Sequence, residues 1–221
     1  MIFANKAIKY FSDLSPTNLK FGGVEIMNPY NSTEVRGAIK KFYNKFYNDS
    51  RKRIYVFGIN PGRFGGGLTG ISFTDPVALR EHCGIENNLG DRKELSSKFV
   101  YKVVDEFGGA EKFFSKVFLT ALYPFAITKE GKNYNYYDDK SLAKKLMPEI
   151  VQTIKSQIEF GARKDFAILL GKKNAEYFFR INEEHNIFTW VAVLEHPRYI
   201  MQYRLKKIDH YIDKYPGAIN N

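Results

Sequence analysis

Four short apolar runs, separated by amphipathic segments, set the pattern of the chain. The runs have the length of buried strands and cover residues 54–57, 116–125, 166–170 and 188–194. Apolar residues recur at helical spacing over residues 4–14, 75–84, 94–107 and 141–161, over about 16 residues after Asn31, and in a basic segment over residues 203–215. Strands that alternate with helices in this way predict an α/β fold with a mostly parallel sheet.

Two other regions have no clear period. Residues 22–31 are rich in turn formers, and residues 128–138 are polar and aromatic. Both are predicted to be loops. Because no repeat, linker or low-complexity tract interrupts the pattern, we expect one domain over residues 1–221.

A glycine-rich stretch follows the first apolar run. Residues 58–70 contain six glycines, which allow the backbone to turn tightly and to approach a ligand closely. Asn60 and Phe73 are the side chains here that can hold a water or stack on a flat ring. The alternative is an ordinary structural loop, since neither a dinucleotide fingerprint nor a P-loop motif is present.

Polar residues follow the other predicted strands as well. Because loops at the carboxyl ends of parallel strands lie on one edge of a sheet, Asn60, residues 120–124, Lys172 and His196 should converge in one cleft. An Asn and a His beside Phe73, without a carboxylate pair or an activated Ser or Cys, do not suit acyl transfer or two-carboxylate glycoside hydrolysis. They suit a reaction in which the leaving group departs as an anion and one side chain holds a water.

The charge of the chain indicates a polyanionic partner. Lys and Arg number 34 against 24 Asp and Glu, which gives a formal net charge of +10 spread along the sequence. Cys83 is the single cysteine and the four histidines lack zinc-type spacing, so we expect neither a metal nor another cofactor. No apolar run approaches 18 residues, so no membrane partner is expected and a cytoplasmic location is predicted.

Two motifs carry a resemblance to a known family. The sequence GINPGRFGGGLTGISF, followed by EHPR about 120 residues later, resembles the two signature motifs of the uracil-DNA glycosylase superfamily. The first motif is most similar to that of the single-strand-selective monofunctional uracil-DNA glycosylases, and the resemblance extends over roughly residues 22–206. It implies a three-layer sandwich with a central, mostly parallel four-stranded sheet flanked by helices. It also implies a monofunctional DNA glycosylase that initiates base excision repair.

The resemblance assigns roles to individual residues of the expected site. Asn60 would position the attacking water, His196 would stabilise the departing base anion, and Phe73 would stack on the flipped base. Further substrate contacts would come from Ile59, Gly62 and Phe64. The loop after the last strand would act as a wedge that enters the duplex, and the expected DNA contacts are Arg63, Lys172, Lys173, Arg198, Tyr199, Ile200 and Met201.

Three departures from the family pattern bear on the substrate. Ala121 occupies the position where the family has an asparagine that reads the uracil edge, and Ala121 cannot hydrogen-bond a base. The wedge reads HPRYIM instead of HPSPRN, and Arg63 and Gly66 replace a proline and a methionine. These departures resemble a bacterial branch that acts on xanthine as well as uracil. We therefore expect a broadened specificity for deaminated bases, in a bacterial protein associated with the nucleoid during repair.

Two other classes of function remain as alternatives. A non-catalytic module on the same fold would bind damaged or single-stranded DNA without forming product, and Ala121 favours this reading slightly. An unrelated small-molecule enzyme would bind free nucleotide and show little salt-sensitive affinity for DNA. Lys172 and Lys173 are more typical of phosphate contacts than of a Schiff-base nucleophile, so an abasic site should be left uncut. Nothing in the sequence calls for more than a monomer.

Overall fold

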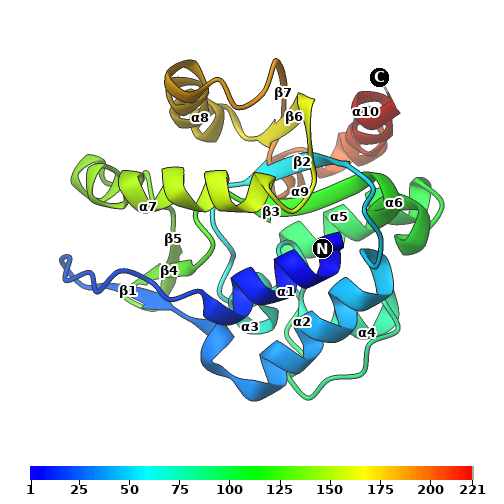
Figure 1. The fold of residues 1–221 in the computed structure, drawn as a ribbon, viewed down its shortest axis with the longest axis horizontal. Helices are drawn as coiled ribbons and strands as arrows, with labels where there is room; N and C mark the ends of the chain where they lie inside the picture. Colours follow the sequence, from blue (N-terminus) through cyan, green and yellow to red (C-terminus); the bar gives the residue numbers. More distant parts are fainter. Residues whose placement is uncertain (221) are drawn as a thin grey trace.

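A four-stranded parallel sheet forms the centre of the protein. We analysed a computed structural model, which describes residues 1–220 (Figure 1). The sheet has the order β3-β2-β6-β7, and its strands are β2 (Arg53–Gly58), β3 (Val117–Ala121), β6 (Ala162–Leu170) and β7 (Trp190–Leu194). All three pairings are parallel. The predicted α/β fold and its four strands are therefore confirmed.

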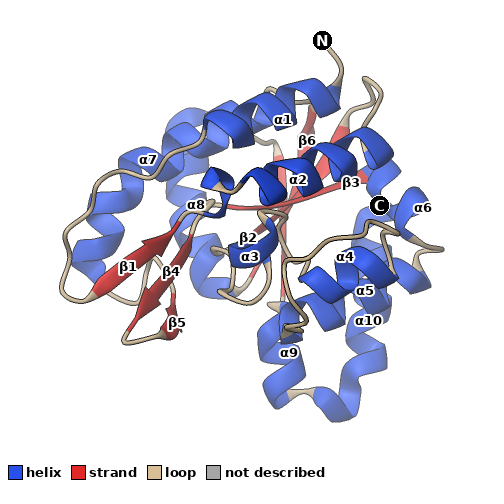
Figure 2. Cartoon of the chain, turned by 90° about the horizontal axis from the view of Figure 1, so that it is seen from below, coloured by secondary structure: helices blue, strands red, loops and turns tan. Residues whose placement is uncertain are grey.

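Helices cover both faces of this sheet (Figure 2). One face is covered by α1 (Phe3–Asp13), α7 (Lys140–Ile158) and α8 (Lys172–His185). From β2, the Tyr55 hydroxyl donates to the Gln157 carbonyl of α7 at 2.6 Å, and the Phe57 ring stacks on Phe178 of α8. On the other side of the strands lie α5 (Leu95–Glu106), α9 (Pro197–Tyr203) and α10 (Ile208–Asn220). The arrangement is the expected three-layer sandwich.

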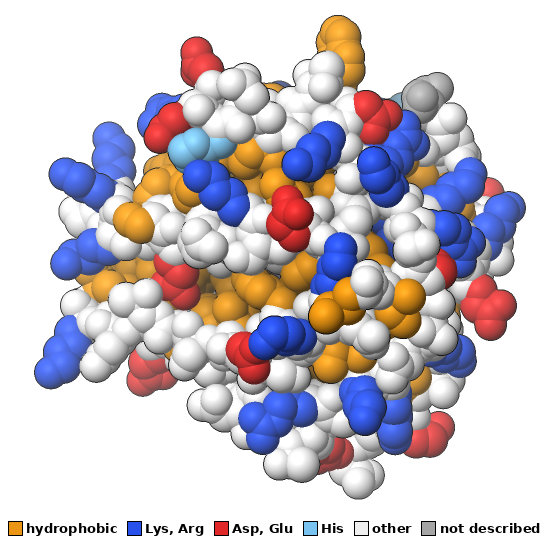
Figure 3. Space-filling view, in the orientation of Figure 1, with side chains coloured by type: hydrophobic (Ala, Val, Ile, Leu, Met, Phe, Trp, Pro, Cys, Tyr) orange, Lys and Arg blue, Asp and Glu red, His pale blue; other side chains and the backbone are white. Residues whose placement is uncertain are grey.

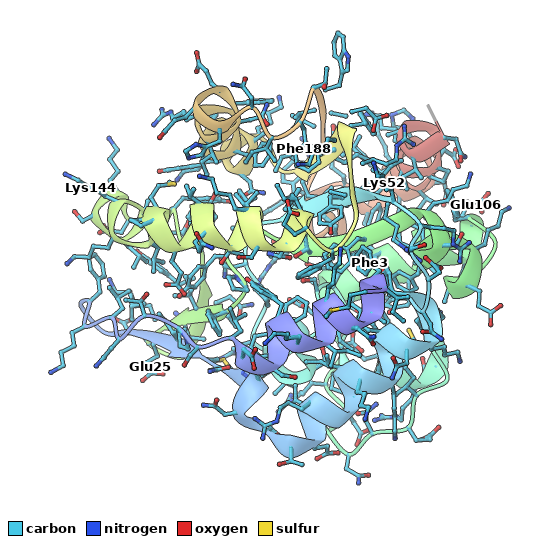
Figure 4. All side chains as sticks on the ribbon, in the orientation of Figure 1. Phe3, Glu25, Lys52, Glu106, Lys144 and Phe188 are labelled. Carbon is cyan, nitrogen blue, oxygen red and sulfur yellow. The ribbon has the colours of Figure 1, made fainter. Side chains whose placement is uncertain are left out.

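Shorter elements complete the chain. Beside α1 packs α2 (Thr33–Phe46), and the remaining helical segments are α3 (Gly66–Thr69), α4 (Pro76–Glu81), α6 (Ala110–Lys116), η1 (Pro29–Asn31) and η2 (Leu205–Lys207). Aromatic rings fill the space between α1, α2 and the sheet. The Phe3 ring, which points inward in Figure 4, lies 5.0 Å from the Tyr47 ring and 5.1 Å from the Phe118 ring. Such pairs add to the stability gained from burying apolar area.

A second, antiparallel sheet contradicts the two predicted loops. It has the order β1-β4-β5 and consists of β1 (Val24–Met27), β4 (Ala126–Lys129) and β5 (Lys132–Tyr134). The turn between β4 and β5 places Glu130 at a φ of 51° and Gly131 at 68°. Positive φ at both positions is typical of a two-residue hairpin turn of type I′, which favours Asn-Gly or Asp-Gly. Because Glu rarely occupies the first of them, the prediction missed this hairpin.

Several predicted boundaries were also wrong. The apolar run at 116–125 contains only five strand residues, because α6 precedes it and β4 begins at Ala126. The helix predicted after Asn31 begins at Thr33, with Ser32 as its cap, since the Ser32 hydroxyl accepts the Val35 N–H. The predicted helix over residues 203–215 is not continuous, because α9 ends at Tyr203, η2 follows and α10 begins only at Ile208.

Candidate active site

A pocket of about 330 Å³ opens at the carboxyl edge of the parallel sheet. Its walls come from the loop after β2, from residues 72–73, from the start of α5, from residues 133–137 and from α9. The lining residues are Gly58, Ile59, Asn60, Pro61, Gly62, Ser72, Phe73, Glu94, Ser96, Ala121, Asn133, Tyr134, Asn135, Tyr137, His196, Arg198, Tyr199, Gln202 and Tyr203. The structure thus brings Asn60, Phe73 and His196 into one cavity.

Asn60 lies two residues beyond the end of β2, and hydrogen bonds hold its side chain. Its Nδ2 donates to the Tyr134 carbonyl at 3.1 Å, and its Oδ1 accepts the Tyr136 N–H at 3.1 Å. An amide oxygen has two lone pairs, so Oδ1 keeps one acceptor site after binding Tyr136. The side chain is therefore oriented by the end of β5 and the segment that follows it, and it can still accept a hydrogen bond from a water.

A buried chain of hydrogen bonds fixes the segment that holds Asn60. The Tyr136 hydroxyl, which is fully buried, donates to Asn174 Oδ1 at 2.9 Å. Asn174 Nδ2 in turn donates to the Gly58 carbonyl at the end of β2, at 3.1 Å. The network begins and ends on the β2 loop, so it locks residues 134–136 against the strand that carries Asn60.

Phe73 is held in an uncommon backbone conformation beside the end of β2. Its φ is 57°, a left-handed value that costs a non-glycine residue on the order of 1 kcal/mol or more. The buried Thr69 hydroxyl stabilises this turn by contacts with the Ile71 and Thr74 backbones. The Phe73 ring lies directly over Gly58, where a Cβ would overlap it. Glycine at position 58 therefore makes room for the ring.

His196 lies two residues beyond the end of β7 and begins α9. Its Nδ1 accepts the Arg198 N–H at 3.2 Å, so the neutral ring carries its proton on Nε2. Burial, aided by the positive charge of Arg198, lowers the pKa of His196 to about 4. The ring centroid is 5.9 Å from that of Phe73. At neutral pH, His196 thus contributes an uncharged N–H donor to the same pocket.

The expected DNA wedge is a helix, and one of its residues was wrongly chosen. In α9 the pocket-lining side chains are Arg198, Tyr199, Gln202 and Tyr203, which share one helical face. Ile200 is fully buried in the core, and Met201 is only partly exposed. A buried Ile200 cannot enter a duplex, so its predicted role as a DNA contact was wrong. Tyr203, which was not expected in the site, is 66% exposed.

Other expected site residues divide between the pocket and its surroundings. Ile59, Gly62 and Ala121 line it, whereas Phe64 lies outside, with the Arg63 and Arg92 guanidinium groups 4.3 and 5.2 Å from its ring centroid. Beside Ala121, the Thr120 hydroxyl donates to Gln157 Oε1 of α7 and so turns away from the cavity.

The two lysines expected to contact DNA also lie outside the pocket. Lys172 and Lys173 are exposed at the start of α8. The ammonium group of Lys173 is 4.6 Å from the Tyr137 ring centroid, and this ring lines the pocket. Both lysines are therefore near the pocket rim rather than among the reacting groups.

Several lining residues had no recognisable signal in the sequence. Glu94 was expected only as the start of a helix, and Ser72, Ser96 and Tyr203 were not considered. Residues 133–137 were predicted to belong to a polar and aromatic loop, but not to the wall of the pocket. Over residues 1–220, no group of three or more His, Cys, Asp or Glu side chains could hold a metal ion. Within the same range, no helix is long and apolar enough to cross a membrane.

Comparisons with known proteins agree with this fold and site. Residues 44–216 match the family model of the uracil DNA glycosylase superfamily, and the chain belongs to that superfamily. It is similar over its whole length to a solved structure, wild-type SMUG2 of Pedobacter heparinus, with 40% sequence identity, a TM-score of 0.95 and coverage of 97% of that chain. No curated protein matches the sequence. The predicted family is confirmed.

Proposed function

We propose that the protein is a monofunctional DNA glycosylase that flips a deaminated base, uracil or xanthine, out of DNA and hydrolyses its N-glycosidic bond. The observation that carries this proposal is the convergence of Asn60, His196 and Phe73 in one pocket of about 330 Å³. That volume is at the lower end of the range for small-molecule sites. A single flipped base fits such a pocket, whereas a duplex does not.

Recognition begins with the flipped base. Extrusion costs a few kcal/mol in lost stacking and pairing, and contacts in the pocket recover this cost. The Phe73 ring supplies a stacking surface, which is worth about 1–3 kcal/mol per base. Tyr199, Arg198 and Gln202 of α9 are placed beside the cavity to contact the vacated position in the DNA.

Bond cleavage leaves the base with the electron pair of the glycosidic bond. The negative charge spreads from the ring nitrogen onto a carbonyl oxygen, and the Nε2–H of His196 donates to that oxygen. A neutral donor fixed in advance suits this task, because it stabilises the developing anion without needing reorganisation. One such donor is worth about 3 kcal/mol of barrier by analogy with oxyanion holes.

The sugar receives a water as the base departs. Asn60 Oδ1, with its free lone pair, accepts a hydrogen bond from that water and directs its oxygen toward C1′. The new bond joins the water oxygen to C1′, and the proton that the water loses balances the charge of the departing anion. The products are a free base and an abasic site.

The lining of the pocket supports a monofunctional reaction. Cleavage of the DNA backbone through a Schiff base needs an amine beside C1′. Within residues 1–220, the pocket lining contains no lysine, and Lys172 and Lys173 lie outside it. We further propose that residues 1–221 act as a single glycosylase domain and as a monomer, since all the groups used here come from one chain.

The decisive experiment measures base release. Oligonucleotides that carry one uracil, xanthine or hypoxanthine, single-stranded or duplexed, are incubated with the protein and then treated with alkali. We expect strand cleavage only after alkali, with at least one of these bases. No release from any of them, with DNA binding intact, would instead favour the non-catalytic binding module.

The water-positioning role has its own test. Asn60→Ala removes the acceptor but leaves Phe73 and His196 in place. It should retain DNA binding and lose most of the single-turnover rate, because the water is no longer directed. An unchanged rate would remove Asn60 from this role.

A further inference from the structure

Glu94 belongs to the wall of the pocket, although the reaction described above does not use it. It precedes α5, and its backbone is fixed at both ends. The Glu94 N–H donates to Asp75 Oδ2 at 2.9 Å, and its carbonyl accepts the Lys98 N–H at 2.9 Å. The side chain does not cap its own helix. It is instead directed toward the glycine loop.

Two glycines of that loop form the seat of the carboxyl group. A Cβ placed on Gly62 would overlap Glu94 Oε1, and a Cβ on Gly65 would overlap Oε2. The carboxyl group therefore lies against both Cα atoms, two and five residues after Asn60. Any side chain at either position would displace it. The glycine loop thus holds Glu94 at the cavity as well as shaping the backbone.

The carboxyl oxygens have no partner within residues 1–220. No hydrogen bond to either oxygen occurs in this part of the chain, although the residue is partly buried. The two oxygens face the open pocket, where water can reach them. A polar group in a binding pocket is normally satisfied by ligand or water. Glu94 is therefore available to a bound base.

The surroundings of Glu94 favour its neutral form. Burial raises the pKa of Glu94 to about 7, the positive charge of Arg198 opposes this rise, and the nearby Asp75 carboxylate adds to it. His196, which lines the same pocket, is neutral at pH 7. The adjacent Arg92 and Lys93 are exposed, and the Lys93 ammonium lies 3.6 Å from Glu81 instead. Near neutral pH, a large fraction of Glu94 is a carboxylic acid.

Deamination creates the chemical group that a carboxylic acid matches. It replaces an amino group with a carbonyl and leaves an N–H on the adjacent ring nitrogen, in uracil, xanthine and hypoxanthine alike. A carboxylic acid offers one O–H donor and one carbonyl acceptor side by side. It can therefore form two hydrogen bonds with this N–H and carbonyl pair, as an asparagine amide does. Ala121, in the same pocket, supplies neither group.

We propose that Glu94, as a neutral carboxylic acid seated on Gly62 and Gly65, reads the carbonyl and N–H edge of the flipped base. It thereby replaces the amide that Ala121 lacks. The inference rests on the glycosylase function proposed above and names the residue that sets its specificity. An ionised Glu94 loses the donor and places a negative charge beside a departing anion, so it opposes the reaction twice.

The test compares three proteins across pH. Single-turnover release of uracil, or of hypoxanthine if the wild type releases only purines, is measured between pH 5.5 and 9 for wild type, Glu94→Gln and Glu94→Ala. Wild-type release should fall above pH 7, by about tenfold for each further pH unit, as the acid ionises. Glu94→Gln keeps a donor and an acceptor at every pH, so it should stay within about threefold of the wild-type rate at pH 6 and show no fall up to pH 9. Glu94→Ala should lose roughly 10- to 100-fold at pH 6.

Two controls separate base reading from a structural role. Glu106→Gln changes a carboxyl group at the other end of α5, which projects away from the molecule in Figure 4, and should leave the wild-type profile unchanged. Binding of DNA with a baseless abasic-site analogue should be equal for wild type and Glu94→Ala, since no edge is present to be read. Weaker binding of that analogue by Glu94→Ala would indicate a distorted pocket and overturn the proposal.

The remaining outcomes are distinguishable. A wild-type pH profile in Glu94→Gln would show that Glu94 is not the titrating group, and would overturn this inference alone. A Glu94→Gln rate as low as that of Glu94→Ala at every pH would also overturn it, because it would assign Glu94 to proton abstraction. Absence of base release by the wild type would overturn the proposed function together with the inference.

Discussion

The ring of His196 shows how a single backbone contact sets the chemistry of a side chain. Because Nδ1 accepts the Arg198 N–H, the ring is fixed in the tautomer that presents Nε2–H. Protonation would remove that acceptor and break the contact that begins α9. The low pKa of about 4 thus preserves both this contact and the neutral donor that the proposed reaction uses.

Replacing His196 should affect the reaction much more than binding. We expect His196→Ala to lower the single-turnover rate by about 10²–10³, which corresponds to about 3–4 kcal/mol, and to retain DNA affinity. In a Glu94→Gln background, the rate with His196 present should be constant from pH 5 to 9, because the ring stays neutral throughout. An inflection between pH 6 and 7 would mean that a protonated His196 takes part.

The stability of the fold should also report on His196. Folding lowers its pKa from 6.5 to about 4, so between these pH values the unfolded chain binds the proton first. The wild type should therefore lose stability relative to His196→Asn as the pH falls from 6.5 to 4, and be unaffected by this group above pH 6.5. Urea denaturation of both proteins at pH 4.5 and 7.5 measures the difference. An equal gap in stability at both pH values would contradict the lowered pKa.

At the scale of elements, the pattern of apolar residues predicted those helices and strands that depend on a single stretch of sequence. The four buried strands and the long helices follow from runs and spacing within one stretch of sequence. The antiparallel sheet does not, because β1 pairs with β4 about a hundred residues later, with Glu25 opposite Thr128, for example. Its hairpin also uses Glu130 where Asn or Asp would have signalled a turn.

The candidate site divides in the same way. Asn60, Phe73 and His196 belong to motifs that are visible in sequence, and the carboxyl edge of the sheet brings Asn60 and His196 together. Glu94 is part of no motif. It reaches the pocket because Asp75 holds its backbone and because Gly62 and Gly65 leave space, and these contacts exist only in the folded chain.

Helix α9 offers a direct comparison of its two faces. Tyr199→Ala removes a ring that is 39% exposed at the pocket, so it should weaken DNA binding and leave stability nearly unchanged. Ile200→Ala removes a fully buried side chain, and should cost about 2–5 kcal/mol of unfolding free energy. Urea denaturation and DNA titration of the two variants measure both quantities. Similar losses of stability would show that α9 is not oriented as described.

At the scale of the molecule, the net charge of +10 does not form a single basic patch on the face shown in Figure 3. There, Lys and Arg side chains are scattered among carboxylates. Under the proposed function, the basic groups expected to contact DNA are those near the pocket, among them Arg198 at its rim and Lys172 and Lys173 beside it. Position, rather than the total, should decide the affinity.

Salt should therefore weaken DNA binding strongly, and individual lysines should contribute unequally to this salt dependence. With about three phosphate contacts, from Arg198, Lys172 and Lys173, raising the salt concentration from 50 to 200 mM should reduce affinity roughly 40-fold. Lys172→Gln should lower the slope of log affinity against log salt by about one. Lys52→Gln, an exposed lysine at the opposite, amino-terminal edge of the sheet, is the matched control (Figure 4) and should not. Equal slopes for the two variants would place the DNA elsewhere.

The seat of Glu94 on two glycines constrains how this sequence can diverge. A side chain at position 62 or 65 is compatible with the fold only where residue 94 is shorter or points elsewhere, since the volumes overlap. Positions 62, 65 and 94 should therefore covary, so that a change at one favours compensating changes at the others. Among relatives, glycine at both loop positions should accompany a long polar residue at the start of α5, and a bulkier loop should accompany its loss.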